Sequence, residues 1–140
     1  MKKVTGPNNI YDSYEYDEYG REIAITSYYI EEEKSFTTRK DYDENNRVVE
    51  ITYPSGFAIS YLYNSYGYLN EVKRKDNSNT IWKAGAMNEF GQWKDYTLGN
   101  NLLMSEFGYD ANGMPETIKT KRISDNEIRQ NLEYSFNPIT

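Results

Sequence analysis

The stretch FGYDANGMPETI, residues 107–118, repeats a pattern that occurs twice earlier in the chain. YEYDEYGREIAI at residues 14–25 and YLYNSYGYLNEV at residues 61–72 have the same frame: two aromatic residues two positions apart, then Asp or Asn, two variable positions and Gly. A repeat with a period of about 20–50 residues is typical of proteins built by stacking one small supersecondary unit. The fold therefore follows from what one such unit forms.

Six units can be aligned on the Asp or Asn of this frame, which we call the anchor. The anchors are Asp17, Asp43, Asn64, Asn88, Asp110 and Asn137, at intervals of 26, 21, 24, 22 and 27 residues. Positions are counted from the anchor. Position −1 is Tyr16, Tyr42, Tyr63, Met87, Tyr109 or Phe136, position +3 is Gly20, Asn46, Gly67, Gly91 or Gly113, and position +8 is Ile25, Ile51, Val72, Tyr96 or Ile118.

Each unit predicts a β-hairpin. The aromatic residues at −3 and −1 lie two apart, so they project from one face of a strand. The anchor favours a type I turn in which its side chain accepts a hydrogen bond from the backbone N–H two or three residues on. Gly at +3 supplies the positive φ that closes such a turn with a bulge. Asn46 fits the same position, because Asn tolerates positive φ better than most residues.

A second set of turns is expected midway between the anchors, where residues that favour turns gather. The candidates are EEEK at residues 31–34, YPSG at 53–56, DNSN at 76–79, LGNN at 98–101 and SDNE at 124–127. No stretch has a sustained helical period. The sequence therefore predicts an all-β fold: one repeat domain over residues 1–140, an antiparallel meander of about ten short strands that forms a curved, open sheet.

Composition restricts the function. The net charge of −6 argues against a nucleic-acid partner, since that binding depends on Lys and Arg. The chain has no Cys and no His, so disulfides, thiolate metal sites and the commonest acid–base groups are absent. No run is apolar enough for a membrane span, and Gly6 and Pro7 interrupt the region where a signal peptide needs apolar residues. We therefore expect neither membrane insertion nor an export signal.

The frame resembles the YD repeats of the Rhs (rearrangement hotspot) family, whose consensus is close to Y-x-Y-D-x-x-G-R-L-x-x-V. The first unit matches it through Tyr16, Asp17, Gly20 and Arg21, the second keeps Arg47, and the fifth has Met114 in place of the usual Arg. The resemblance extends to the L-G-N segment that connects repeats in that family. Here that segment is formed by Leu98, Gly99 and Asn100.

This resemblance implies a bacterial, toxin-associated and non-catalytic wall segment of a shell. Its partners would be further YD repeats or an enclosed polypeptide, and its location would be exported or at the cell surface. No Asp-Pro-rich self-cleaving segment and no toxin domain is recognisable. The two edge strands would also allow self-association. Asn137 lacks its Gly at +3, so we expect an incomplete last turn.

The aromatic residues raise an alternative function. Six tyrosines are expected to pack on the inner face: Tyr14, Tyr16, Tyr61, Tyr63, Tyr109 and Tyr134. Exposed aromatic residues suit sugar rings as well as protein contacts. The candidate ligand residues are Tyr19, Tyr66 and Tyr68 at the turns and Trp82 and Trp93 in the fourth unit. They suggest a carbohydrate-binding module at a cell surface as the alternative function. The two Trp residues are expected to pack against a neighbouring unit, with ligand binding as their alternative role.

Catalytic and metal sites are not expected. Asp17, Asp43 and Asp110 already serve as turn anchors, so a hydrolase with an Asp/Glu pair is only a remote alternative. DYDENNRVVEIT at residues 41–52 begins like a calcium loop. It has Asn46 where that loop needs Gly and Thr52 where it needs Glu. We therefore predict no enzyme, no cofactor and no metal.

Overall fold

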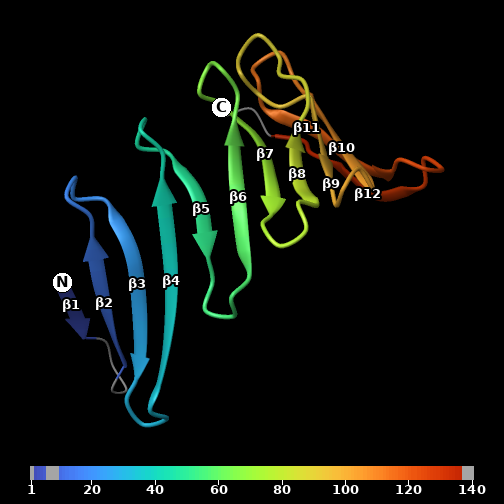
Figure 1. Cartoon of the computed structure of the whole chain (residues 1–140). Coiled ribbons are helices and arrows are strands. Elements are labelled where there is room, and N and C mark those ends of the chain that lie inside the picture. The colour runs from blue at the N-terminus through green and yellow to red at the C-terminus, as the bar shows by residue number, and fades with distance from the viewer. Residues whose placement is uncertain (1, 6–9, 137–140) are drawn as a thin grey trace. The chain divides into compact units, whose positions relative to one another are not determined.

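A computed structural model describes residues 2–5 and 10–136 of the chain, which form an all-β fold with no helix in that part (Figure 1). The strands are β1 (Lys2–Thr5), β2 (Ile10–Tyr16), β3 (Glu22–Tyr29), β4 (Lys34–Tyr42), β5 (Val48–Thr52), β6 (Ala58–Tyr63), β7 (Leu69–Arg74), β8 (Thr80–Ala84), β9 (Asp95–Leu98), β10 (Leu103–Tyr109), β11 (Pro115–Arg122) and β12 (Ile128–Glu133). The predicted fold class is confirmed. The additional strands, β1 and β12, flank the hairpins on which the expectation of about ten strands was based.

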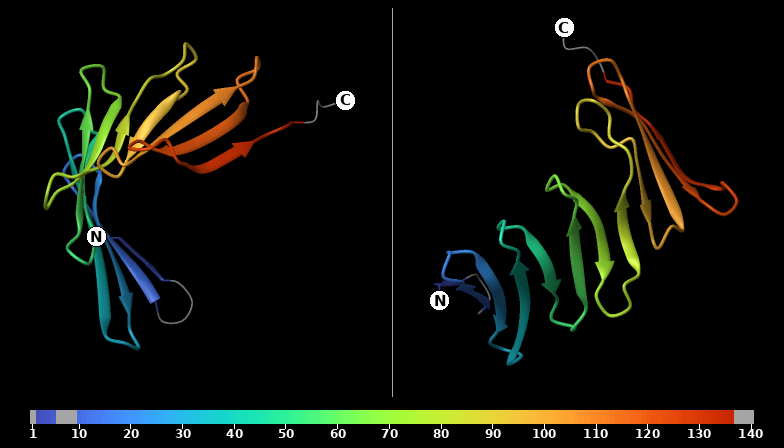
Figure 2. Two further views of the ribbon diagram at one scale, coloured as in Figure 1. Left: turned by 90° about the vertical axis from the view of Figure 1, so that its right-hand side faces the viewer. Right: turned by 45° about the horizontal axis from the view of Figure 1, so that its top comes forward.

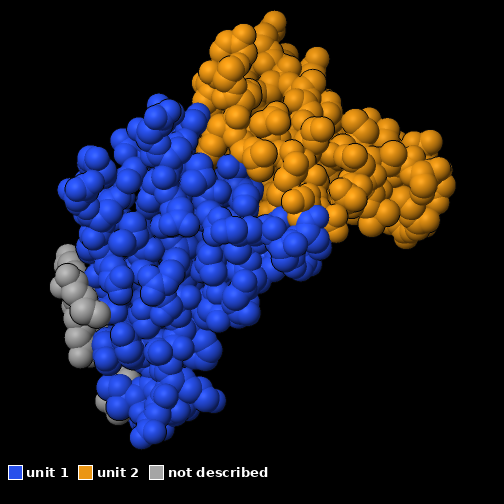
Figure 3. All heavy atoms as spheres, viewed as in Figure 1, with its two compact units in different colours: residues 1–61, 74–77 blue, residues 62–73, 78–140 orange. Residues whose placement is uncertain are grey.

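The chain divides into two compact units (Figure 3). Unit 1 comprises residues 1–61 and 74–77, and unit 2 comprises residues 62–73 and 78–140. Within each unit, successive strands pair antiparallel in chain order, as expected for a meander. The division falls within the third repeat, where the sequence frame continues without a break.

Three of the hairpins carry the expected bulge. The register shifts between Glu15 and Tyr16 in the β2–β3 pair, between Asp41 and Tyr42 in the β4–β5 pair, and between Gly108 and Tyr109 in the β10–β11 pair. Each shift lies immediately before an anchor. An extra residue at this point is what a turn closed by positive φ at +3 introduces into the ladder.

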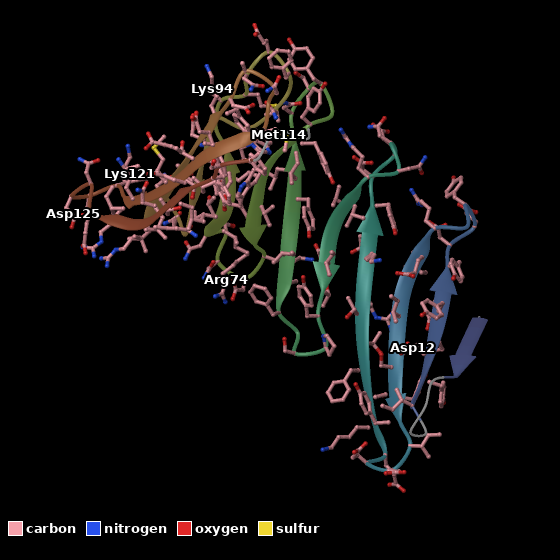
Figure 4. The ribbon with its side chains drawn as sticks, turned by 180° about the vertical axis from the view of Figure 1, so that it is seen from behind. Asp12, Arg74, Lys94, Met114, Lys121 and Asp125 are labelled. Atoms are coloured by element: carbon pink, nitrogen blue, oxygen red, sulfur yellow. The ribbon has the colours of Figure 1, made fainter. Side chains whose placement is uncertain are left out.

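Each unit has an aromatic face, which we define by cross-strand partners. In unit 1 it includes Tyr14, Ile25, Phe36, Ile51 and Ile59, and in unit 2 it includes Trp82, Tyr96, Phe107, Ile118 and Leu132. The opposite face carries ion pairs such as Arg39–Glu15 and Lys121–Glu106. No second layer of described strands covers the sheet of either unit (Figure 2), and side chains project from both faces (Figure 4).

A single layer buries little apolar surface. Ala24, 1% exposed, and Ile59, 8% exposed, are the buried apolar residues among residues 10–136. The other buried residues of this range carry hydroxyls: Ser13, Thr26, Ser105 and Thr120. The Thr26 hydroxyl pairs with that of Thr37 at 2.9 Å, and the Ser105 hydroxyl pairs with that of Thr120 at 2.8 Å. Small side chains are covered here by taller neighbours on the same face, so the sheet depends on its ladder and its cross-strand contacts.

The expectation that all six inner tyrosines pack is wrong for two of them. Tyr14, Tyr61, Tyr63 and Tyr109 are half-buried, whereas Tyr16 and Tyr134 are 46% and 40% exposed. A ring on a one-layer sheet is covered only where neighbouring strands present large side chains beside it. Asn137 and Thr140 lie outside the described residues, and so does the expected incomplete turn. No described helix has the length and apolar character needed to span a membrane.

Candidate functional site

Five anchors form turns of one geometry, which we call the Asx turns: residues 17–20, 43–46, 64–67, 88–91 and 110–113. In each, the anchor carbonyl accepts the N–H of position +3 at 2.9–3.1 Å. The anchor Oδ1 accepts the N–H groups of positions +2 and +4 at 2.9–3.0 Å. The predicted side-chain bond to +2 is thus confirmed in all five turns. The second bond to Oδ1 comes from +4 and not from +3, because the N–H of +3 donates to the anchor carbonyl.

Position +3 has positive φ in all five turns, as predicted. The angles are 77° at Gly20, 62° at Asn46, 87° at Gly67, 77° at Gly91 and 78° at Gly113. In the connecting segment after β9, Gly99 and Asn100 also have positive φ, of 60° and 59°. They follow Leu98, the last residue of β9, and the Asn100 N–H donates to the Thr80 carbonyl at 2.7 Å.

The tyrosine at −1 joins its repeat to the preceding one. The Tyr42 hydroxyl donates to the Glu22 carbonyl at 2.8 Å, and the Tyr109 hydroxyl donates to the Trp93 carbonyl at 2.9 Å. Glu22 and Trp93 both occupy position +5 of the preceding repeat. Because the acceptor is backbone, the bond does not depend on the residue type at +5. From the sequence, Tyr109 was expected only to pack, and Tyr42 was named only as a residue of the repeat frame. Tyr rather than Phe at −1 in four of six units was the available signal for the hydroxyl bond.

Position +4 supplies a second link in unit 1. Arg21 Nε donates to Asp17 Oδ2 at 2.6 Å, and Arg21 Nη1 donates to Asn46 Oδ1 of the second turn at 2.8 Å. The guanidinium also lies 4.7 Å from the ring centroid of Tyr42 and 5.0 Å from that of Tyr19. Arg21 thus combines an ion pair, a bond to the next turn and cation–π contacts.

Unit 2 forms the corresponding link without charge. Gln92 Nε2 donates to the Gly113 carbonyl of the fifth turn at 2.8 Å. Gln92 Oε1 accepts a hydrogen bond from Nδ2 of its own anchor, Asn88, at 2.9 Å. The amide therefore has the same two kinds of partner as Arg21, one in its own turn and one in the next.

The two charged turns of unit 1 hold their anchors ionised. Burial acts to raise the pKa of Asp17, but hydrogen bonds from the backbone and side chain of Arg21 outweigh it, so the pKa lies below its usual 3.8. The backbone N–H of Arg47 is the largest cause of the lowered pKa of Asp43. The Arg47 guanidinium adds an ion pair to Asp43 at 2.7 Å. Hydrogen bonds to a carboxylate favour its charged form.

Hollows lie between consecutive Asx turns. In unit 1, a hollow of 390 Å³ between the first two turns is lined by Tyr19, Arg21, Tyr42, Asp43, Glu44 and Asn46. In unit 2, a hollow of 480 Å³ between the fourth and fifth turns has Phe90, Gln92, Tyr109 and Asp110 among its lining residues. Both hollows are lined by positions +2 and +4 of one repeat and by position −1 and the anchor of the next. The hollows are therefore products of the repeat.

The structure separates the predicted ligand residues into two groups. Tyr19, Tyr66 and Tyr68 lie at Asx turns and are strongly exposed, with Tyr66 at 85%. Phe90, at position +2 like Tyr19 and Tyr66, is 75% exposed; its place in the poorly matching fourth unit concealed it in the sequence. Trp82 and Trp93 are half-buried and contact each other edge to face, with their ring centroids 5.4 Å apart. The exposed group can meet a ligand, whereas the two Trp rings pack against each other.

The described residues contain no group of three acidic side chains placed to hold a metal ion. In the calcium-like segment, Asp43 Oδ1 receives the N–H groups of Asn45 and Arg47, and its Oδ2 receives the Arg47 guanidinium. These contacts use the carboxylate in the turn itself.

Comparison with solved structures identifies the fold. The chain is similar to a chain of the TcdB2–TccC3 crystal structure and to one of the TcdB2–TccC3–Cdc42 complex, each at 19% identity with a TM-score of 0.75. A further match is to the Tc holotoxin pore of Photorhabdus luminescens, at 20% identity with a TM-score of 0.70. No protein-family model and no curated sequence matches the chain.

The similarity shows an Rhs-like fold. The match covers 91% of this chain but only 7% of each TcdB2–TccC3 chain. For the holotoxin pore it covers 85% of this chain and 6% of the matched chain. The chain therefore corresponds to a short segment of those much longer proteins. The fold expected from the YD frame is confirmed at this level.

Proposed function

We propose that the protein is a non-catalytic wall segment, whose aromatic face packs against a partner polypeptide or against further repeats. The observation that carries the proposal is the link between repeats. Tyr42 and Tyr109 each bind a backbone carbonyl of the preceding repeat. A link of this kind can continue from repeat to repeat, as a stacked array requires.

The burial pattern supports a partner on the aromatic face. Phe36 of unit 1 and Leu132 of unit 2, both on the aromatic face, remain exposed, and no second layer of described strands covers either sheet. Exposed apolar residues grouped on one face of a soluble protein favour an interaction surface. The similarity to toxin-complex chains supports the fold on which the wall role rests, and the enclosed polypeptide follows from the Rhs resemblance.

Site-specific photocrosslinking in the source cells tests this proposal. Phe36 lies on the aromatic face, and its neighbour Ser35 lies on the opposite face of the same strand. A photoreactive phenylalanine at position 36 should crosslink to polypeptide outside residues 1–140, and the same group at position 35 should not. Equal crosslinking from both positions, or none from position 36, would contradict the wall role.

We propose carbohydrate binding as the second candidate, favoured by the exposure of Tyr66 and Tyr68 beside the third Asx turn. Exposed aromatic rings suit sugar faces. Tyr66→Ala should then abolish binding to a glycan while leaving the melting temperature unchanged, and Tyr109→Phe, which removes the inter-repeat bond, should leave glycan binding unchanged. The absence of any saturable signal on a broad glycan panel would exclude this candidate.

A further inference from the structure

In four of the five Asx turns, the charge of the residue at +4 matches the anchor: an acidic anchor has Arg there, and a neutral anchor has a neutral residue. The anchors Asp17 and Asp43 have Arg at position +4, and the neutral anchors Asn64 and Asn88 have the neutral residues Tyr68 and Gln92 there. The fifth turn has a negative anchor, Asp110, but Met114 at +4. Its own turn therefore supplies no cation to the anchor carboxylate.

The contacts of Asp110 show the consequence. Its Oδ1 accepts the N–H groups of Asn112 and Met114, both at 2.9 Å, as in the other turns. Asp17 and Asp43 use Oδ2 to bind a guanidinium nitrogen at 2.6 and 2.8 Å. Among the side chains of residues 10–136, none forms an ion pair with Asp110.

A hollow adjoins this carboxylate. It measures 200 Å³, and its lining includes Asp110, Glu116, Tyr134 and Phe136. Glu116 is exposed and forms no ion pair with a side chain of residues 10–136, while Tyr134 and Phe136 are 40% and 50% exposed. Met114 and Asp125 lie beyond opposite ends of β11 (Figure 4). The lining of the hollow thus includes two acidic and two aromatic residues.

In unit 1, a carboxylate and an aromatic ring at matching repeat positions hold a guanidinium from the chain itself. There, a guanidinium pairs with the anchor Asp17 and lies 4.7 Å from the ring of Tyr42, which occupies position −1 of the following unit. Phe136 occupies position −1 after Asp110. The hollow therefore repeats the carboxylate and the ring of the Arg21 site in a unit that has Met114 in place of Arg.

We propose that the hollow formed by Asp110, Glu116, Tyr134 and Phe136 binds the guanidinium group of an arginine carried by a partner polypeptide. A guanidinium pairs with a carboxylate through two N–H groups and stacks on a ring, whereas an ammonium is a hydrated point charge. The net charge of −6 favours the approach of a cationic segment. Only the choice of a polypeptide as the carrier rests on the wall function; the guanidinium site rests on the residues.

An NMR titration of the full chain with N-acetyl-arginine amide tests the site. We expect saturable shifts of the backbone amides of Asn112 and Met114, which donate to Asp110, and of the ring signals of Tyr134 and Phe136. N-acetyl-norleucine amide, which carries no charge, should cause no such shifts. Because the probe is a small molecule, failure here would remove the arginine site and leave the crosslinking test of the wall unaffected.

Three variants make the test specific. Asp110→Asn keeps the turn, since Asn64 and Asn88 serve as anchors elsewhere, and should weaken binding at least about tenfold. Met114→Arg supplies the cation within the turn and should abolish binding of the probe. Arg21→Met should create a matching site beside Asp17 and Tyr42 and add a second set of shifts. No saturable shift in the natural chain, or unchanged binding in Asp110→Asn or Met114→Arg, would overturn the proposal.

Discussion

The link between the first two Asx turns and the link between the fourth and fifth have the same hydroxyl bond but different chemistry at position +4. Tyr42 and Tyr109 each donate to a +5 carbonyl. Arg21 then adds charge and ring contacts in unit 1, whereas Gln92 adds only amide hydrogen bonds in unit 2. The tyrosine and the turn geometry are therefore the common requirement of the link, and the charge is a local addition to it.

Loss of a turn should have the largest effect on stability, because the turn holds the residues of the link in place. Gly113 has a φ of 78°, which a β-branched residue adopts only at a cost of roughly 1–3 kcal/mol. Gly113→Val should therefore lower the melting temperature markedly. Gly113→Asn is the matched control and should melt close to the natural chain, because Asn46 has a φ of 62° at the same position. Unchanged melting of the Val variant would show that the fifth turn is assigned wrongly.

Removal of one hydroxyl should weaken the two links equally. Tyr42→Phe and Tyr109→Phe each leave a +5 carbonyl without its hydroxyl donor, and each should cost about 0.5–1.5 kcal/mol in urea unfolding. Tyr66→Phe is the control, because that ring is 85% exposed. A much larger loss in one unit than in the other would mean that the residue at +4, and not the tyrosine, carries the link.

Acid should weaken only the charged link. The pKa of Asp17 is lowered in the folded state, so its contribution to stability is present above the unfolded pKa and is lost as the pH falls through the folded pKa, below 3.8. The neutral anchor Asn88 has no such dependence. Carboxyl NMR should place the titration of Asp17 below 3.8, and Arg21→Gln should move it upward. Titration of Asp17 at or above its ordinary value would contradict the ion-paired geometry.

The hairpins and their turns could be predicted because they are local. Asp or Asn followed three residues later by Gly encodes a turn within a few residues, and Asn46 was recognised from its tolerance of positive φ. The strand β1 was not predicted, because KKVT lies before the first anchor and carries no repeat frame. The YPSG turn was expected, but not that it would reproduce the backbone bonds of the Asx turns, with Gly56 N–H donating to the Tyr53 carbonyl at 2.9 Å.

The links between repeats could not be predicted from position alone. The Tyr109 hydroxyl bonds to a carbonyl 16 residues away, and Arg21 bonds to Asn46, 25 residues away. These contacts depend on how the hairpins register side by side. The exposure of Tyr16 was also missed, because the sequence shows which face a ring occupies but not whether a neighbouring strand covers it.

The size of the native assembly tests the wall account most directly. Extract from the source cells would be separated by size under native conditions, and the fractions analysed by immunoblot and mass spectrometry for this chain. The account predicts recovery in a species much larger than 16.5 kDa that contains further polypeptide, covalently continuous or tightly bound. Recovery as a monomer of 16.5 kDa without other polypeptide would contradict it.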